Sequence, residues 1–162
     1  MSGTPSGLVI RPATTADRDG FLDAALRSWL DAYAERLPRD EVEAAPAMLE
    51  RAFEKRGAEL VLALLDGVVV GFYSLGPADD PERRNYLWHV YVDPRAQRRG
   101  VGRALTEAAL SEIATRGATT AWLDVLSGNE KARAFHRALG WVEVGYDSSG
   151  EYGLVILERT IG

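Results

Sequence analysis

The order in which strand-like and helix-like segments follow one another limits the fold of this chain more than any other feature of its sequence. Short runs rich in β-branched and aromatic residues predict strands, and apolar residues spaced three and four positions apart predict helices. Strands are expected over residues 8–10, 59–65, 68–75, 86–92, 119–126, 141–146 and 152–157. Helices are expected over residues 15–35, 39–55, 101–116 and 130–139. The order βααβββαβαββ predicts an α/β (α+β) fold in which helices pack on a mixed sheet.

Turn residues set several of these boundaries. Asp66-Gly67 lies between two strand-like runs and predicts a two-residue hairpin, because this pair tolerates the positive φ angles of such a turn. Thr14 and Thr15 are candidate N-caps for the first helix, and Gly117 is a candidate C′ residue for the third. Pro46 can divide the second helical stretch into two short helices, since proline lacks the N–H that a helix interior uses.

Composition bounds the size and class of the protein. We expect a single domain over residues 1–162, with an ordered core over 7–160. The net charge of −5 argues against a nucleic-acid binder, whose surface is usually basic. Without cysteine, and with two histidines 47 positions apart, the chain is expected to hold neither disulfides nor a metal. A polar N-terminus, and no apolar run near the ~20 residues that cross a bilayer, predict a cytoplasmic protein with no membrane partner.

The segment Gln97-Arg98-Arg99-Gly100-Val101-Gly102 carries the strongest functional signal, because it follows a predicted strand and opens a predicted helix. The first turn of a helix leaves about four backbone N–H groups unbonded, and glycine lets a ligand approach that backbone closely. The stretch from Arg83 to Arg103 sums to +5, with six arginines and one acid, and arginine binds phosphate oxygens well. The pattern predicts an anion cradle, and a solvated basic loop is the alternative.

Two nucleotide-binding signatures are absent from this segment. A P-loop needs the pattern G-x-x-x-x-G-K-[S/T], which the chain lacks. A dinucleotide fingerprint needs a small residue three positions after Gly102, where Leu105 stands. The anion is therefore expected to be neither a nucleoside triphosphate nor NAD.

The pattern Gln97-x-x-Gly100-x-Gly102 between a strand and a helix resembles the acyl-CoA loop of the GNAT superfamily of N-acyltransferases. Two further segments resemble the family's central strand and its second cofactor segment: Val90-Tyr91-Val92-Asp93-Pro94 and Asn129-x-x-Ala132-x-x-Phe135-His136-x-x-x-Gly140-Trp141. The element order agrees as well, so the resemblance covers nearly the whole chain. It implies a mostly antiparallel, twisted sheet of about seven strands with about four helices, and a V-shaped splay between the two central strands.

The resemblance also implies that acetyl-CoA binds in that splay as a co-substrate. The central strand would pair with the pantetheine arm like an added strand, and the loop would hold the diphosphate. Asn129 would bond the pantetheine, while Ala132 and Phe135 would line the thiol end, unless they form an ordinary apolar helix face. The expected cofactor-binding residues are Val90, Tyr91, Val92, Gln97, Arg98, Arg99, Gly100, Val101, Gly102, Arg103, Asn129, Ala132, Phe135 and His136.

The implied reaction is direct attack of a primary amine on the thioester in a ternary complex. An alkyl amine has a pKa of roughly 10, so it must first lose a proton. His89 and, second, Asp124 are the candidate bases, and His136 is the candidate proton donor at a position where the family usually has tyrosine. The backbone N–H near Val92 is expected to hold the oxyanion. Packed neutral histidines and a salt-bridged or solvent-facing acid are the structural alternatives.

Trp29 and Tyr33 are candidate walls of the acceptor site, or ordinary core residues. The acceptor can be a small-molecule or a peptide amine. A non-catalytic regulatory module that binds CoA or acyl-CoA is the second hypothesis. A binder of phosphorylated sugars or nucleic acid is the third, and the negative net charge speaks against it. Dimers are common in the family, and the sequence does not decide whether a homodimer forms.

Overall fold

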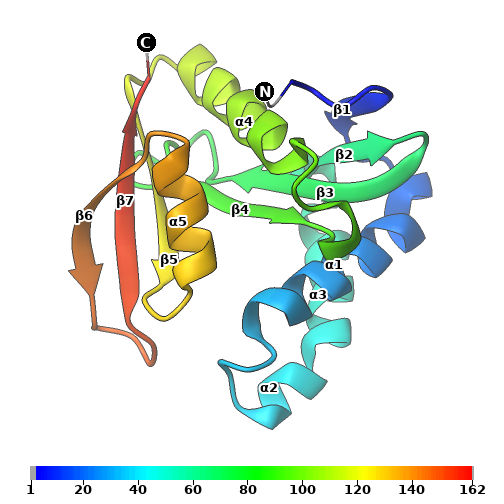
Figure 1. Cartoon of the computed structure of the whole chain (residues 1–162), viewed down its shortest axis with the longest axis horizontal. Coiled ribbons are helices and arrows are strands. Elements are labelled where there is room, and N and C mark those ends of the chain that lie inside the picture. Colours follow the sequence, from blue (N-terminus) through cyan, green and yellow to red (C-terminus); the bar gives the residue numbers. More distant parts are fainter. Residues whose placement is uncertain (1–2, 162) are drawn as a thin grey trace. The chain divides into compact units, whose positions relative to one another are not determined.

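The structure is a computed structural model that describes residues 3–161 (Figure 1). Within this range the chain forms seven strands, five α-helices and three short 3₁₀ helices. In chain order they are β1 (Leu8–Pro12), η1 (Thr15–Asp17), α1 (Arg18–Tyr33), α2 (Arg39–Glu43), α3 (Ala45–Arg56), η2 (Gly57–Glu59), β2 (Val61–Leu65), β3 (Val68–Leu75), β4 (Leu87–Val92), η3 (Pro94–Ala96), α4 (Val101–Thr115), β5 (Thr120–Leu126), α5 (Glu130–Ala138), β6 (Val142–Asp147) and β7 (Leu154–Thr160). The predicted α/β class and element order are confirmed. The extra helix arises because the stretch predicted over 39–55 divides at Ala44, with Pro46 in the first turn of α3.

The strands hydrogen-bond in two sheets, where the sequence predicts one. The first sheet has the order β1-β2-β3-β4, and the second has the order β5-β7-β6. β1 pairs antiparallel with β2, and β2 with β3, while β5 and β6 both pair antiparallel with β7. The difference arises because element order alone does not determine which strands hydrogen-bond. The V-shaped splay concerns the relative placement of two strands and stays a prediction.

The chain divides into two compact units. The first unit comprises the residues up to Ser74 together with His89–Ala108, and the second comprises Leu75–Trp88 together with the residues from Ala109 onward. A single domain over residues 1–162 stays a prediction. Among the helices of residues 3–161, none has both the length and the apolar character that crossing a membrane requires.

In the first unit, an aromatic core fastens α1 and α3 to the sheet of β1–β4. The ring centroid of Phe21 in α1 lies 4.9 Å from that of Phe72 in β3 and 5.3 Å from that of Phe53 in α3. All three side chains are buried, as is Leu62 of β2. Apolar area removed from water is the main source of folding free energy, so this cluster sets the position of α1 against β3.

Gly71 in β3 allows its neighbours to approach closely. A Cβ at this position would lie 2.7 Å from the carbonyl oxygen of Tyr91 in β4 and 3.0 Å from the side chain of Leu105 in α4. Leu105 is fully buried, so it has little room to move. The path of β4 beside β3 therefore depends on glycine at position 71.

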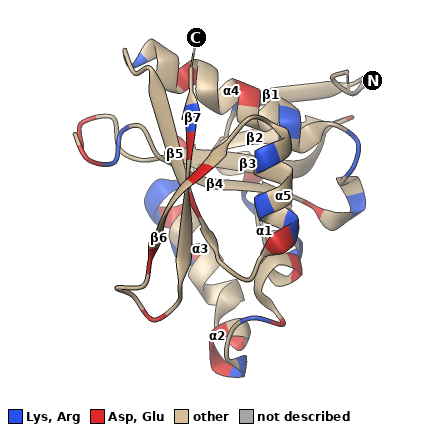
Figure 2. Ribbon diagram, turned by 60° about the vertical axis from the view of Figure 1, so that its left-hand side comes forward, with Lys and Arg blue, Asp and Glu red and all other residues tan. Residues whose placement is uncertain are grey.

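In the second unit, α5 is fastened to the sheet by an ion-pair network. Arg133 of α5 donates to the carboxylate of Glu143 in β6 from Nε (2.8 Å) and Nη2 (3.0 Å). Hydrogen bonds from Arg133, and also from Arg137, lower the pKa of Glu143 to about 2. Figure 2 shows basic and acidic residues side by side on α5.

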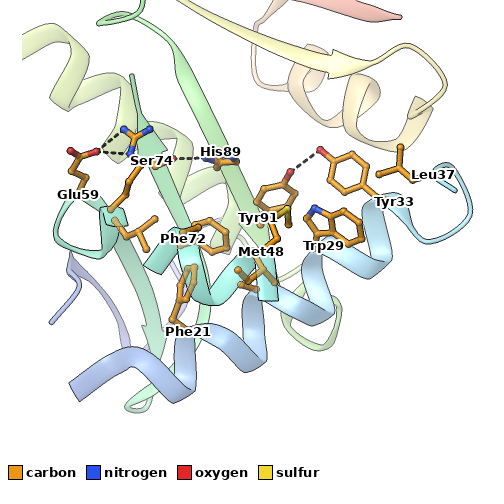
Figure 3. Close-up of a pocket in the computed structure, with 15 residues that line it drawn as sticks. Phe21, Trp29, Tyr33, Leu37, Met48, Glu59, Phe72, Ser74, His89 and Tyr91 are labelled. Carbon is orange, nitrogen blue, oxygen red and sulfur yellow. Dashed lines mark hydrogen bonds and ion pairs between the residues drawn. The ribbon is translucent and has the colours of Figure 1, made fainter. Parts of the chain in front are cut away.

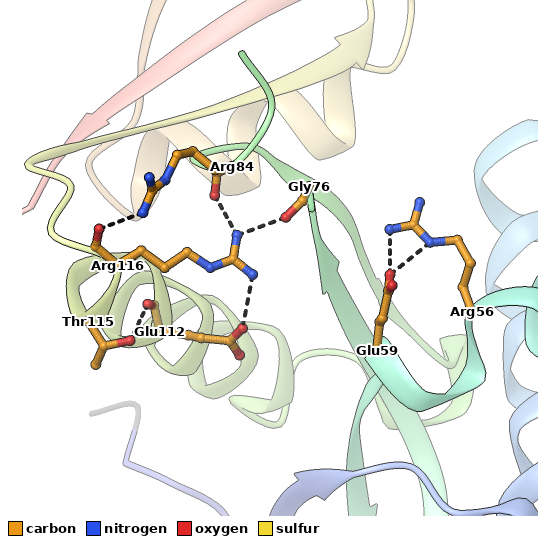
Figure 4. Close-up of polar contacts among 7 residues, drawn as sticks. All are labelled: Arg56, Glu59, Gly76, Arg84, Glu112, Thr115 and Arg116. Atoms are coloured by element: carbon orange, nitrogen blue, oxygen red, sulfur yellow. Dashed lines mark hydrogen bonds and ion pairs between the residues drawn. The ribbon is translucent and has the colours of Figure 1, made fainter. Parts of the chain in front are cut away.

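Arg116, directly after α4, fixes the loop between β3 and β4 (Figure 4). Its guanidinium donates to the carbonyl oxygens of Gly76 (2.8 Å) and Arg84 (2.6 Å), and the Arg84 guanidinium donates to the carbonyl oxygen of Arg116 (2.8 Å). A Cβ on Gly76 would collide with the carbonyl oxygen of Arg83. These bonds give the loop backbone its partners, as buried polar groups require.

The predicted turn residues behave as expected. Asp66 and Gly67 have φ angles of 50° and 83°, as the predicted hairpin requires, and Gly117 has a φ of 85° after α4. The amide of Thr14 donates to Oδ2 of Asp17 at 2.7 Å, which completes a capping box. The first turn after Thr14 is a 3₁₀ helix, so α1 begins at Arg18.

Asp93, directly after β4, ties this strand to α1. Its side chain is 2% exposed and accepts hydrogen bonds from Nε of Arg27 (2.8 Å) and from the amide of Arg95 (3.0 Å). Burial alone would raise the pKa of Asp93, but the hydrogen bonds from Arg95 and Arg27 outweigh it and lower the pKa. The carboxylate therefore anchors the start of the glycine-containing loop.

We expect Asp93→Ala to lower the free energy of unfolding by about 2 kcal/mol, since Arg27 loses its partner and η3 loses its cap. The loss stays below the roughly 3–5 kcal/mol of a fully buried pair, because the Arg27 side chain is 35% exposed and regains water. Urea unfolding measures it. Asp93→Asn is the matched control, since it keeps a cap acceptor and should lose less. An unchanged midpoint in Asp93→Ala contradicts the anchoring role.

Candidate active site

An apolar pocket opens in the first unit, where α1 and α3 meet β3 and β4 (Figure 3). Its volume is about 370 Å³, near the lower end of the roughly 300–1,000 Å³ of small-molecule sites. Five aromatic side chains form much of its wall: Phe21, Trp29, Tyr33, Phe72 and Tyr91. The pocket is therefore suited to an apolar ligand group.

His89 of β4 is the histidine that lines this pocket. Its Nδ1 lies 2.6 Å from Oγ of Ser74 in β3, which leaves Nε2 as the ring nitrogen available to a ligand. The residue as a whole is exposed, but the side chains around the imidazole desolvate it. This desolvation, together with the positive charge of Arg56, lowers the pKa of His89 below its usual 6.5. The imidazole is consequently neutral at neutral pH and able to accept a proton.

The two candidate wall residues, Trp29 and Tyr33, both line this pocket. The hydroxyl of Tyr33 lies 2.8 Å from that of Tyr91, and the ring centroid of Trp29 lies 5.1 Å from that of Tyr33. Burial, with a contribution from Tyr33, raises the pKa of Tyr91 well above its usual 10. The structure thus brings Trp29, Tyr33 and Tyr91 together with His89 in one pocket.

The loop of residues 97–103 is held between β4 and α1. The side-chain amide of Gln97 donates to Oδ2 of Asp31 (3.1 Å) and to the carbonyl oxygen of Val92 (3.3 Å). Arg98 and Gly100 both have a positive φ, of 65° and 84°. A Cβ on Gly100 would lie 3.0 Å from the carbonyl oxygen of Gly3, so the N-terminal segment passes directly over this glycine.

This loop fits a diphosphate. The first turn of α4 offers backbone N–H groups that have no partner within the helix, at the positive end of its dipole. The side chains of Arg98 and Arg99 are exposed beside it. Amide donors at a helix N-terminus, with guanidinium groups nearby, are the donor set that phosphate oxygens prefer.

The arginine stretch 83–103 does not act as one positive patch. Arg84 is bonded to the backbone of Arg116, and Arg95 donates to the carboxylate of Asp93. Arg103 pairs with Glu107 at 3.5 Å. The sum of +5 already includes Asp93, and a carbonyl partner leaves Arg84 charged. Of these three contacts, the pair with Glu107 alone offsets charge that the count along the chain retains.

In the second unit, α5 carries the segment that includes the predicted proton donor. Asn129 caps α5 by accepting a hydrogen bond from the amide of Ala132 (3.2 Å). His136 is 5% exposed, its Nδ1 has no hydrogen-bond partner among residues 3–161, and burial lowers its pKa to about 4. Its ring lies edge-on to Trp141, with the centroids 6.0 Å apart. His136 is thus neutral at neutral pH and can donate a hydrogen bond only as an uncharged imidazole.

Two other predicted residues of this unit are exposed. Phe135 is 37% exposed, so it is available to a ligand and is not an ordinary core residue. Asp124 of β5 is also exposed. Its pKa is raised above the usual value, chiefly by partial burial and also by the negative charge of Asp147, while the positive charge of Arg83 opposes this increase. The structure places His89 in the first unit, and Asp124 and His136 in the second.

The sequence reasoning missed the polar residues that surround His89. Ser74 is 5% exposed and bonds the ring, while Arg56 and Glu59 form an ion pair at the pocket, with Nε of Arg56 2.9 Å from Oε2 of Glu59. The signal for Ser74 is a hydroxyl at the end of an otherwise apolar strand. Nothing in the sequence pattern of the helix 39–55 indicates that its end lies near position 89.

Comparison with known proteins gives the class to which this fold and site belong. The model of the acetyltransferase (GNAT) family matches residues 22–141. An aminoglycoside N(6′)-acetyltransferase type 1 of Klebsiella aerogenes is 30% identical over 144 residues, which is 86% of this chain and 92% of that protein. The chain belongs to the GNAT acetyltransferase family, and the predicted resemblance is confirmed.

Two other relatives match different extents of the chain, one over a short segment of sequence and one over nearly the whole fold. A [ribosomal protein bS18]-alanine N-acetyltransferase of Salmonella typhimurium is 46% identical over 57 residues, 35% of this chain and 38% of that protein. The match thus spans little more than a third of that relative's length. A GCN5-related N-acetyltransferase from Rhodopseudomonas palustris has a TM-score of 0.77 at 25% identity, covering 99% of this chain and 98% of that one.

The fold also matches a protein crystallised with coenzyme A. The PaiA N-acetyltransferase of Thermoplasma acidophilum, solved in complex with coenzyme A, has a TM-score of 0.75 at 19% identity, covering 94% of this chain and 98% of that one. At this identity the likeness shows the fold alone.

Proposed function

We propose that this protein transfers the acetyl group of acetyl-CoA to a primary amine by direct attack. The observation that carries the proposal is His89: a neutral, accessible imidazole, held at Nδ1 by Ser74, on the strand that leads into the glycine loop. The family match supports the same reaction.

Bound acetyl-CoA would supply an electrophilic thioester carbonyl. Nε2 of His89 accepts the proton that the attacking amine must lose, and the hydrogen bond to Ser74 holds the ring in place. The backbone N–H near Val92 is assigned the oxyanion, and the N–H groups of residues 97–103, with Arg98 and Arg99, are assigned the diphosphate.

The second unit is assigned the remaining cofactor contacts by the resemblance. Asn129 and Phe135 are assigned the pantetheine and the thiol end, and His136 donates a hydrogen bond to the departing sulfur. Asp124 is the second candidate base. A cytoplasmic location and a peptide or small-molecule acceptor complete the proposal, without a metal.

Coenzyme A binding tests the loop assignment. We expect CoA at about 100 times its Kd to stabilise the protein by roughly 2.7 kcal/mol and to raise Tm by about 5–10 °C. Thermal unfolding at fixed protein concentration measures the shift. The double variant Arg98→Ala/Arg99→Ala should reduce the shift several-fold, whereas Arg51→Ala, an exposed arginine of α3, should leave it unchanged.

An acetyl-transfer assay over a panel of primary amines tests the chemistry. Turnover of acetyl-CoA that requires the amine supports the transferase. No shift with millimolar CoA contradicts the loop assignment. A clear shift without transfer to any amine supports the regulatory CoA-binding module instead.

A further inference from the structure

The pocket around His89 is lined by charged and hydroxyl side chains at one end and mainly by aromatic side chains at the other. Figure 3 shows Glu59 and Ser74 on one side of His89, and Tyr91, Tyr33 and Trp29 on the other. The ion pair and Ser74 thus lie on the imidazole side, and the rest of the wall is aromatic and aliphatic, with the hydroxyls of Tyr33 and Tyr91 bonded to each other. A ligand that matches both ends has one polar group at His89 and an apolar body directed toward Trp29.

The charges of the lining residues exclude a second cationic group on that body. Glu59 is the acidic residue among those that line the pocket, and it is already paired with Arg56 through Nε (2.9 Å) and Nη2 (2.6 Å). The lining therefore has no net negative charge to receive another ammonium group. Burying an unpaired charge against aromatic rings is costly, so polyamines and amino sugars are poor matches.

The aromatic wall favours a ring. Phe21, Phe72 and Tyr91 form a connected cluster, with centroids 4.9 Å apart for Phe21 and Phe72 and 5.4 Å apart for Phe72 and Tyr91. Trp29 and Tyr33 add a second pair. Aromatic rings gain from offset and edge-to-face contacts in addition to the area that they bury.

We infer that the acceptor is an arylalkyl amine, a single primary amine joined by a short linker to an aromatic ring. The inference rests on the proposed function and deepens it, because it assigns a substrate class to the same pocket. The amine lies at Nε2 of His89, and the ring lies against Trp29, Tyr33 and Phe72. In the reaction, the new bond joins the amine nitrogen to the acetyl carbon, the carbon–sulfur bond breaks, and the amine's proton passes to His89 while CoA leaves as thiolate.

Ala52 of α3 provides a variant that fills the pocket without disturbing the core. It lines the pocket yet is exposed, so the tryptophan of Ala52→Trp can lie in the pocket from its edge. Ala47 lies on the same helix, is also exposed and does not line the pocket. Ala47→Trp is therefore the matched control.

The test compares kcat/KM for four acceptors at saturating acetyl-CoA: 2-phenylethylamine, ethylamine, 1,4-diaminobutane and a short peptide with an N-terminal alanine. We expect 2-phenylethylamine to exceed ethylamine by about 10- to 100-fold, the factor that burial of one aromatic ring provides. Ala52→Trp should remove most of this preference, and Ala47→Trp should retain it.

Binding of the unreactive product N-(2-phenylethyl)acetamide, measured by calorimetry on the protein with CoA, gives a readout that needs no turnover. We expect binding to the wild type and to Ala47→Trp, and at least 10-fold weaker binding to Ala52→Trp. Equal turnover of all four amines, or a preference for the diamine or the peptide, overturns the substrate class and leaves the transferase standing. If no amine is acetylated, the proposed function fails, but amide binding still tests which class of ligand the pocket takes. Amide binding that Ala52→Trp abolishes supports an arylalkyl ligand. No binding at millimolar amide overturns this ligand class.

Discussion

His89→Ala should reduce kcat for amine acetylation by about 100-fold or more, since a positioned general base contributes roughly 10²–10⁴-fold. The variant removes the imidazole from an accessible site on β4 and leaves the aromatic core beneath it intact. The CoA-induced shift in Tm should stay as in the wild type, because the loop of residues 97–103 is unchanged. Steady-state kinetics with saturating acetyl-CoA measures the loss.

The pH profile separates a base from a wall residue. Desolvation places the pKa of His89 below 6.5, so the active, neutral form predominates at pH 7 and activity falls as the pH drops below 6.5. His89→Ala should lose this acidic limb. Ser74→Ala should keep the limb but lower kcat several-fold, since the ring loses the partner that holds it. An unmoved acidic limb in His89→Ala would assign the base to another group, with Asp124 next in line.

His136 should make the protein less stable in mild acid, by about 2.5 kcal/mol between pH 7 and pH 4.5. Its pKa is about 4 in the folded chain and 6.5 when unfolded. Between these values the unfolded chain binds more protons than the folded chain, so stability is complete above pH 6.5 and falls as the pH drops. The effect follows from a buried ring whose Nδ1 has no hydrogen-bond partner among residues 3–161.

The measurement compares urea unfolding of the wild type with that of His136→Phe at both pH values. Carboxylates such as Asp17 and Glu143 titrate in both proteins, so their contribution cancels in the difference. The variant should show a correspondingly smaller loss. Parallel pH curves contradict a buried neutral histidine. In the transfer assay, His136→Phe should lower turnover more than cofactor affinity if the ring serves the departing thiolate, and unchanged turnover removes it from the mechanism.

The turns and the order of helices and strands were predictable, because they depend on residues close together in the sequence. Asp66-Gly67 and Gly117 are one- and two-residue patterns whose geometry depends little on the rest of the chain, and both hold. Of the two N-cap candidates, Thr14 caps the 3₁₀ helix η1, and α1 itself begins after Asp17. Sheet pairing is a long-range property, so the division of the seven strands into two hydrogen-bonded sheets was not predictable from these local signals. Pro46 correctly indicated that the second helical stretch divides.

Some residues of the candidate site could be identified from the sequence, and others could not. Trp29, Tyr33 and His89 were identified from the sequence and lie in one pocket. Ser74, Arg56 and Glu59 reach the same pocket from segments 15 to 33 positions away in sequence from His89, and no spacing rule reports such proximity. The partners of the arginine stretch were not predictable either, since Arg84 bonds the backbone of Arg116, 32 positions away.

Glycine at position 71 of β3 also affects the neighbouring strand β4. The carbonyl oxygen of Tyr91 would lie only 2.7 Å from a Cβ on residue 71, and Tyr91 and His89 share a face of β4. A natural variant at this buried position would therefore push on the strand that holds the imidazole, although it touches neither substrate nor cofactor. New acceptor preferences can therefore evolve at Trp29 and Tyr33, the partly buried wall residues, whereas position 71 accepts almost no side chain.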